Sequence, residues 1–341
     1  MILYRKSAAL RLRRVAAPEP PFWYATAVAP YGGRRAAPVA IDYVDLRATS
    51  AEKLEVAVCE DPAAELSRQM RVTDPVMVDT AEMTESIFGR GDEVLRACHE
   101  TGLATLTLVS TEGVIPEAAR DTVIVAWPPK IELLEPLFKE AAERGLHWGV
   151  FVPVVYPITT DLATLASLAA HSEQHGARYF AAAAVDLDAT AKQAIASEWA
   201  LDGDDYATLF HSDLEPLAIA TERHVGALAA EHGMADFVLP PQWPARSNWN
   251  AAILLTLTAS RMIAIGRELE LAGSLSRSAR AVAELGKPIA RVAEAASLSI
   301  VGSLDEVSVD ILGDWLESGR SAFVDRIDEE WRLRRDHFGA E

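Results

Sequence analysis

Residues 133–152 read LLEPLFKEAAERGLHWGVFV, and this stretch decides the fold class because it contains one complete helix-to-strand unit. The amphipathic run Leu133–Arg144 predicts a helix. Gly145 stands just past its end, where glycine adopts the left-handed conformation without steric strain. Trp148–Val152 is a continuous apolar run, which is typical of a parallel strand covered on both faces. The stretch therefore predicts one unit of a parallel β/α fold.

The same order of helix, glycine and apolar strand recurs along the chain, with Gly102, Gly176 and Gly233 each following a predicted helix. The other predicted strands are Leu54–Val58, Val76–Asp79, Ala104–Val109, Val123–Ala126, Tyr179–Val185 and Phe237–Leu239. The other predicted helices are Ala63–Met70, Asp92–Thr101, Leu162–His175, Thr190–Ala200 and Leu214–His232. No G-x-G-x-x-G follows the first strand, which argues against a dinucleotide-binding fold. We expect an α/β protein with a full or partial parallel (β/α) barrel, similar to a TIM barrel.

The pattern changes on both sides of this region, which predicts three segments. Residues 1–22 form a basic N-terminal arm, 23–240 the α/β barrel, and 241–341 a C-terminal helical subdomain. Within the last segment, Asn248–Leu271 and Trp315–His337 carry apolar residues at helical spacing. We expect these helices to cap the barrel or to mediate formation of a homodimer.

Composition limits the classes of function. The 341 residues carry a formal net charge of −18 and are 50% hydrophobic. A polyanion would be repelled by most of such a surface, so we expect no general nucleic-acid binding. The sequence shows neither a signal-peptide pattern nor an apolar run of membrane-spanning length, so we expect a cytoplasmic protein without membrane contact. Cys59 and Cys98 are too few for a site of three or four thiolates, and we expect both to be structural.

Residues 37–47 read APVAIDYVDLR and resemble, in position and spacing, the C-x-x-x-C-x-x-C loop of radical S-adenosylmethionine (SAM) enzymes of the spore-photoproduct-lyase type. Residues 54–66, 72–111 and 133–159 resemble further strands and helices of this family in the correct order, so the resemblance covers about 23–240. Ala37, Ile41 and Val44 occupy the three cysteine positions, and none of these side chains can bind iron.

In that family the cluster holds SAM and supplies the electron that cleaves it. The resemblance therefore implies a radical-SAM-like fold without an iron–sulfur cluster and without radical chemistry. We expect a pseudoenzyme that acts as a binding or accessory protein, as a homodimer or as the partner of a true radical SAM enzyme. The strand ends that bind a ligand can be retained when the cluster is lost. We therefore consider SAM or nucleotide binding as the retained activity.

In an α/β barrel the ligand site lies at the carboxyl ends of the strands. The candidate ligand-binding residues there are Ser110, Thr111, Glu112, Tyr156 and Asp186. Arg34 and Arg35, in the loop that precedes the vestigial cluster positions, are the cations expected to meet a phosphate. The competing interpretation is that these polar residues cap the helices that follow, which we favour for Ser110 and Asp188.

Two other classes of function stay open. Asp79 and Glu82 at a strand end could hold a divalent metal or act as an acid/base pair, which would make the chain a cluster-free barrel enzyme. A nucleic-acid-associated protein that uses residues 1–14 is the third hypothesis. His171 and His175 are four apart on a predicted helix, and we favour a solvated pair because two ligands without a third are weak support for a metal site.

Overall fold

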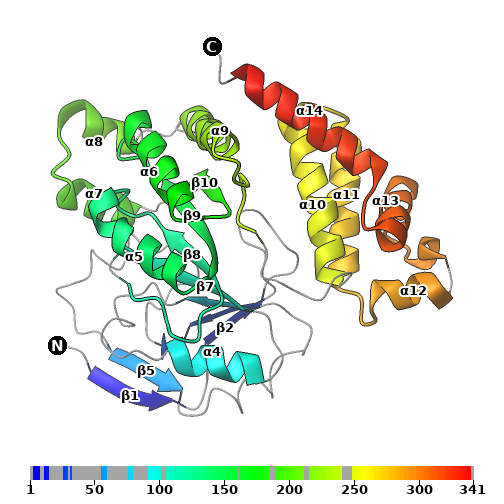
Figure 1. Ribbon diagram of the computed structural model, residues 1–341, viewed down its shortest axis with the longest axis horizontal. Coiled ribbons are helices and arrows are strands. Elements are labelled where there is room, and N and C mark those ends of the chain that lie inside the picture. Colours follow the sequence, from blue (N-terminus) through cyan, green and yellow to red (C-terminus); the bar gives the residue numbers. More distant parts are fainter. Residues whose placement is uncertain are drawn as a thin grey trace. The chain divides into compact units, whose positions relative to one another are not determined.

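The computed structural model describes residues 3–7, 11–14, 26–29, 31–32, 55–59, 76–79, 91–100, 105–111, 113–159, 161–184, 189–210, 215–239, 248–295 and 297–338. These residues divide into two compact units (Figure 1). The first unit contains the described residues up to Leu239, and the second contains those from Asn248 onward.

The first unit is mixed α/β, as the sequence predicts. Its strands are β1 (Leu3–Ser7), β2 (Arg11–Arg14), β3 (Thr26–Ala29), β4 (Tyr31–Gly32), β5 (Glu55–Cys59), β6 (Val76–Asp79), β7 (Thr105–Ser110), β8 (Asp121–Val125), β9 (His147–Val154) and β10 (Phe180–Ala184). Its helices are α4 (Gly91–Glu100), α5 (Ile131–Glu143), α6 (Leu162–Gln174), α7 (Ala189–Glu198), α8 (Gly203–Phe210) and α9 (Glu215–Glu231).

The main sheet has seven strands in the order β10-β9-β8-β7-β6-β3-β2. All neighbours from β3 to β10 are parallel, and only β2 pairs antiparallel, with β3. Each strand from β7 to β10 therefore lies beside the strand that precedes it in the chain, with no reversal of order. A second, three-stranded sheet has the order β1-β5-β4.

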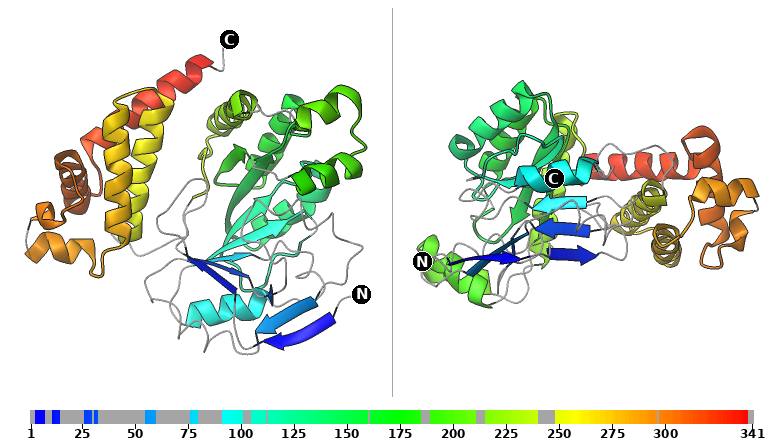
Figure 2. Two further views of the ribbon diagram at one scale, coloured as in Figure 1. Left: turned by 180° about the vertical axis from the view of Figure 1, so that it is seen from behind. Right: turned by 90° about the horizontal axis from the view of Figure 1, so that it is seen from below.

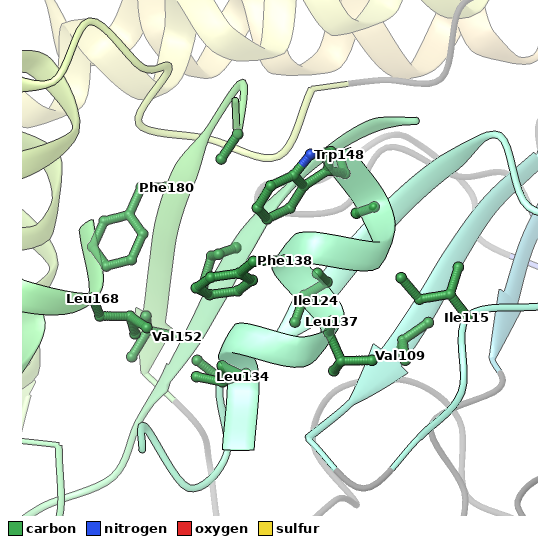
Figure 3. Packing of buried hydrophobic residues seen from close by; sticks show 14 of the residues in the cluster. Val109, Ile115, Ile124, Leu134, Leu137, Phe138, Trp148, Val152, Leu168 and Phe180 are labelled. Carbon is green, nitrogen blue, oxygen red and sulfur yellow. The ribbon is translucent and has the colours of Figure 1, made fainter. Parts of the chain in front are cut away.

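Helices α4, α5, α6 and α9 cover one face of the main sheet and form one hydrophobic cluster with it. From α5, Phe138 enters this cluster and meets the ring of Trp148 on β9, with ring centroids 5.2 Å apart. Figure 3 shows Phe138 and Leu134 among Ile124, Trp148 and Val152 of the neighbouring strands. Because α4, α5 and α6, which connect strands between β6 and β10, share one face, this part of the sheet is wound in one direction.

The alternate residues of the strands point to the other face, which is also buried. The fully buried residues on this face that lie outside the helix-facing cluster include Leu106, Leu108, Val123, Val125, Phe151 and Ala181. The sheet is thus covered on both faces, which explains its continuous apolar strands.

A close approach between β9 and the residue before β10 fixes their packing. Gly149 lies against Tyr179, because a Cβ on Gly149 would stand 2.4 Å from the Tyr179 carbonyl oxygen and 2.5 Å from its ring. Tyr179 is fully buried, and its hydroxyl donates a hydrogen bond to the Thr122 carbonyl at 2.8 Å. The glycine is therefore required for close approach, not for backbone flexibility.

Several sequence expectations are changed by the structure. Residues 1–22 were expected to form a basic arm, yet they include the strands β1 and β2, and β2 belongs to the main sheet. Phe237–Leu239 is not a strand; a single parallel bridge joins Tyr179 to Ala235 instead. Gly145, Gly176 and Gly233 do follow helices in the left-handed conformation, as predicted. The predicted helix Ala63–Met70 lies outside the described residues.

In its described part, the second unit consists of helices. They are α10 (Asn248–Ala264), α11 (Leu269–Ala283), α12 (Ile289–Ala295), a 3₁₀ turn η1 (Leu298–Ile300), α13 (Glu306–Ser318) and α14 (Ala322–Phe338). Both views of Figure 2 show α10 and α11 side by side. The predicted helical runs Asn248–Leu271 and Trp315–His337 are each interrupted, because Gly266 and Gly319 adopt φ values of +66° and +80° that end α10 and α13.

Polar contacts join the helices of this second unit. The Asn248 side chain donates to the carbonyls of Leu285 and Lys287 and accepts from the Ile289 N–H, so it connects the start of α10 to the turn before α12. Arg261 of α10 pairs with Asp328 of α14. These contacts supplement a shared apolar core.

Candidate functional site

The strands of the main sheet end together at its carboxyl edge, where parallel α/β sheets bind their ligands. At this edge β7 leads into Thr111, β8 leads into Ala126 and Trp127, and β9 leads into Val155 and Tyr156. The residues that follow these three strands form the described part of the candidate site.

Thr111 joins the ends of β7 and β8. It is 7% exposed, and its hydroxyl donates a hydrogen bond to the Trp127 carbonyl at 2.6 Å. Ser110, the last residue of β7, is half-buried, and its carbonyl accepts from the Gly113 N–H at 2.9 Å. The structure thus places both predicted residues at the edge, where Thr111 fixes the position of Trp127.

Trp127 forms an aromatic pair with Trp199, which directly follows α7. The ring centroids are 6.1 Å apart and the rings are tilted by 48°, within the range of favourable aromatic pairs. Trp127 is 2% exposed. Neither buried indole N–H has a hydrogen-bond acceptor among the described residues. Most buried donors have a partner, so two adjacent donors without one are unusual.

Lys130 completes this group, which we call the tryptophan cluster: Trp127, Trp199 and Lys130. The Lys130 ammonium lies 5.5 Å from the centroid of the Trp199 ring, a cation–π distance. Within the part of the chain that the structure describes, this ammonium has no carboxylate partner. The cluster therefore combines two flat rings, two N–H donors and one positive charge.

Tyr156 extends the site toward α9. Its half-buried hydroxyl shares a hydrogen bond with the Thr221 hydroxyl at 3.0 Å, which joins the residue after β9 to α9. His224 follows one helical turn later, and its buried Nε2 has no partner among the described residues. The Tyr156–Thr221 pair adds two hydroxyls to the edge.

Sequence reasoning missed five of these residues: Trp127, Lys130, Trp199, Thr221 and His224. Trp127 and Lys130 carry a local signal, since Trp-Pro-Pro-Lys follows a predicted strand directly and so marks the carboxyl edge. The sequence has no comparable signal for Trp199, because its contact with Trp127 spans 72 positions of the chain (199 minus 127).

The structure locates only some of the other predicted residues. Asp79 is the last residue of β6 and is aligned with Leu108 of β7, so its strand position is at the carboxyl edge. The remaining predicted site residues lie outside the described residues: Arg34, Arg35, Ala37, Ile41, Val44, Glu82, Glu112, Asp186 and Asp188.

Among the residues that the structure describes, no group of three His, Cys, Asp or Glu side chains could hold a metal ion. The His171 ring Nδ1 donates to the Ser167 carbonyl at 2.8 Å, and the His175 ring lies 6.4 Å from Phe138. Cys98 is buried in α4, and burial raises the pKa of its thiol to about 12. This thiol is therefore protonated at neutral pH, as expected for a structural cysteine.

The opposite edge of the sheet, where the strands start, holds a second polar group. His147 and Asp121 are partners in the β8–β9 ladder, and their side chains meet at 2.7 Å. His99 meets the Thr105 hydroxyl at 3.0 Å, and burial together with nearby Arg120 lowers the pKa of His99. Ligand sites of parallel α/β folds lie at the carboxyl edge, so this amino-edge group is not part of the candidate site.

No helix in the described part of the chain is both long and apolar enough to cross a membrane. Comparisons of the chain with models of known protein families, with curated proteins and with solved structures find no match.

Proposed function

We propose that this protein is a cluster-free, radical-SAM-like pseudoenzyme that binds a nucleoside-containing ligand, SAM or a nucleotide, at the carboxyl edge of its main sheet. One observation carries the proposal: Trp127 and Trp199 form an aromatic pair, and the buried indole N–H of each has no acceptor among the described residues. A buried donor without a partner costs about 1–3 kcal/mol, and a nucleobase offers both acceptors and a face for stacking.

The fold supports the proposal through its second buried face. All helices of the helix-facing cluster lie on one side of the sheet, yet Leu106, Val123 and Phe151 on the other side are buried as well. A sheet that curves into a full or partial barrel covers this face with its own strands. We infer such a barrel, whose carboxyl-edge mouth would be the ligand site.

The choice of binding over radical catalysis rests on the sequence. The chain has two cysteines, which is fewer than the three thiolates that the C-x-x-x-C-x-x-C loop provides. The side chains whose contacts are described at the carboxyl edge include hydroxyls, indoles and an ammonium. Such groups recognise bases, sugars and anions by hydrogen bonding and stacking.

Native mass spectrometry of the intact chain with added SAM, ATP or adenosine tests the proposal. We expect a one-to-one complex with at least one of these ligands. Trp199→Phe, which removes an N–H and keeps a ring, should weaken that complex by about tenfold. Trp249→Phe is the matched control, because Trp249 in the second unit also has a buried indole N–H without an acceptor among the described residues. Absence of all three complexes would refute the proposal.

A cluster-free barrel enzyme is the second candidate, and the position of Asp79 at the end of β6 favours it. In that case Asp79→Asn and Glu82→Gln would abolish divalent-metal binding or turnover. A pseudoenzyme that acts with a partner predicts that both variants keep ligand and partner binding. The same native spectra report whether the chain forms a homodimer, which is one of the two roles expected for the second unit.

A further inference from the structure

The outer edge of β10 carries open backbone groups. β10 stands at the end of the main sheet, next to β9. The Phe180 N–H points away from β9, because it donates a hydrogen bond to the Ala235 carbonyl at 2.9 Å. Every second residue of a parallel strand bonds to the same side, so the N–H and the carbonyl of Ala182 also point outward. Ala182 is partly exposed, and among the described residues these two groups have no partner.

The segment after α9 begins to pair with this edge and then leaves it. Ala235 forms a parallel bridge with Tyr179, and its N–H donates to the Arg178 carbonyl at 3.0 Å. The chain bends at residues 236 and 237, and within the described chain no further backbone hydrogen bond joins β10 to residues 236–239. The first contact of a further parallel strand is therefore in place, and it fixes the register of that strand.

The sequence after the bridge is suited to a longer strand. Residues 237–239 read Phe-Val-Leu, an apolar run with an aromatic and a β-branched residue, which favours a strand. In the register of the bridge, Ala182 would donate to the Phe237 carbonyl and accept from the Leu239 N–H. Both open groups of Ala182 would then have partners. The next donor of such a ladder would be Pro241, which has no N–H, so the strand would end there.

The added strand would reach the carboxyl edge of the sheet. Bridge partners share a face, so Phe237 would stand beside Ala181 and Leu239 beside Ala183. Ala181 belongs to the buried face opposite the helices, and Ala183 is partly exposed. Two large apolar side chains would therefore cover this face at the end of β10, beside the edge where a parallel sheet binds its ligand.

We infer that residues 236–239 form a strap that has two positions. In one position the strap bends away from β10, as the structure shows it. In the other it extends the Ala235 bridge into a parallel strand that closes this end of the sheet over a bound ligand. This inference rests on the proposed function, because a ligand at the carboxyl edge supplies the difference in contacts that favours the closed position.

The occupant of the β10 edge is this segment of the same chain. The bridge at Ala235 holds the strap beside the edge at a high effective concentration, which a second copy or a free peptide does not have. Asp236 and Phe237 make other contacts in the bent position. Closure therefore exchanges those contacts for backbone bonds to β10, so the two positions are separate states of the strap.

Hydrogen exchange of the full chain, resolved to single amides by NMR spectroscopy, tests the inference without ligand and with ATP, adenosine or SAM. In the free chain we expect the Ala182 amide to exchange at least about tenfold faster than the Ala181 amide, which faces β9. A ligand that binds should slow the Ala182 amide by at least about tenfold. Leu239→Pro removes a donor of the closed strand and should reduce this slowing to about twofold or less. Leu239→Ala keeps the N–H and is the matched control, and the Ala181 amide reports whether β10 stays paired with β9 in both variants.

The outcomes separate the strap from the proposed function. If a ligand binds by native mass spectrometry but the Ala182 amide does not slow, the strap is wrong while the proposed function stands. The same holds if the amide slows as much in Leu239→Pro as in Leu239→Ala. If none of the three ligands binds, the proposed function fails and the strap fails with it. An Ala182 amide that is protected in the free chain and loses protection on dilution would show that a second copy covers the edge, which would also overturn the inference.

Discussion

Gly149→Ala tests the packing of β9 against Tyr179. The added methyl would stand 2.4–2.5 Å from the Tyr179 carbonyl oxygen and two of its ring carbons. These distances are roughly 1 Å short of the optimum for non-bonded atoms. The carbonyl is held by the Val150 N–H at 3.0 Å, and the ring is held by the hydroxyl bond to Thr122. Neither can withdraw without breaking a buried hydrogen bond.

Overpacking a well-filled core costs about 1–3 kcal/mol, and we place this variant at about 3 kcal/mol because two held groups are displaced together. For a unit of this size the loss corresponds to a fall in Tm of about 6–12 °C. Thermal unfolding followed by far-ultraviolet circular dichroism measures it. Gly145→Ala is the control, because Gly145 has open space but a φ of +63° and should lose only about 1 kcal/mol.

The double variant Gly149→Ala/Tyr179→Leu isolates the contact. Removing the ring should relieve part of the clash, so the combined loss should be smaller than the sum of the single losses. A Gly149→Ala protein that unfolds at or above the temperature of Gly145→Ala would refute the described packing. So would strictly additive losses in the double variant.

Three further predictions concern single side chains. Tyr179→Phe removes the hydroxyl bond and should lower the free energy of unfolding by about 1 kcal/mol, measured by urea denaturation; no change would contradict a buried bond. Asp305→Ala should destabilise the second unit by about 1 kcal/mol, because Asp305 caps α13 and accepts bonds from Ser274 and Ser308. Burial raises the pKa of Asp305, but the hydrogen bonds that the carboxylate accepts outweigh burial and lower the pKa. The contribution of Asp305 to the stability of the folded state is therefore complete above the ordinary carboxyl pKa and is lost as the pH falls through the lowered value. An Asp305→Ala effect that grows on acidification would contradict this assignment. Cys98 should resist iodoacetamide at pH 8 until the protein unfolds, since burial raises its pKa to about 12; rapid labelling of the native protein, located by mass spectrometry, would show that it is accessible.

The sequence predicts most of the elements from β6 to α9 because each contains its own signals, but it does not predict α8. Apolar runs mark the strands, amphipathic runs mark the helices, and Gly145, Gly176 and Gly233 mark the helix ends. The helix boundaries in the second unit are harder to predict from the sequence. Gly266 and Gly319 end helices, but the apolar pattern continues into the next helix. Periodicity alone therefore predicts one long helix where the structure has two.

The candidate site is predictable only in outline. The rule that ligands meet the carboxyl ends of strands correctly selects the positions of Thr111 and Tyr156 at that edge. Pairing of Trp127 with Trp199 depends on where the end of α7 lies relative to β8, which is a property of tertiary packing. Strands β1 and β2 were missed because their basic residues suggested an N-terminal arm, whereas their strand structure comes from pairing with β5 and β3.

The strand order of the main sheet also bears on how the chain can assemble. From β7 to β10, every strand pairs with the strand that precedes it in the chain, so each addition closes a loop of modest length and small entropic cost. During folding, a new strand can therefore add to either side of two strands that have already paired. Deleting chain from β10 backward would shorten such a sheet at one edge and leave the earlier pairings intact, which makes nested C-terminal truncations a direct way to find the smallest segment that folds.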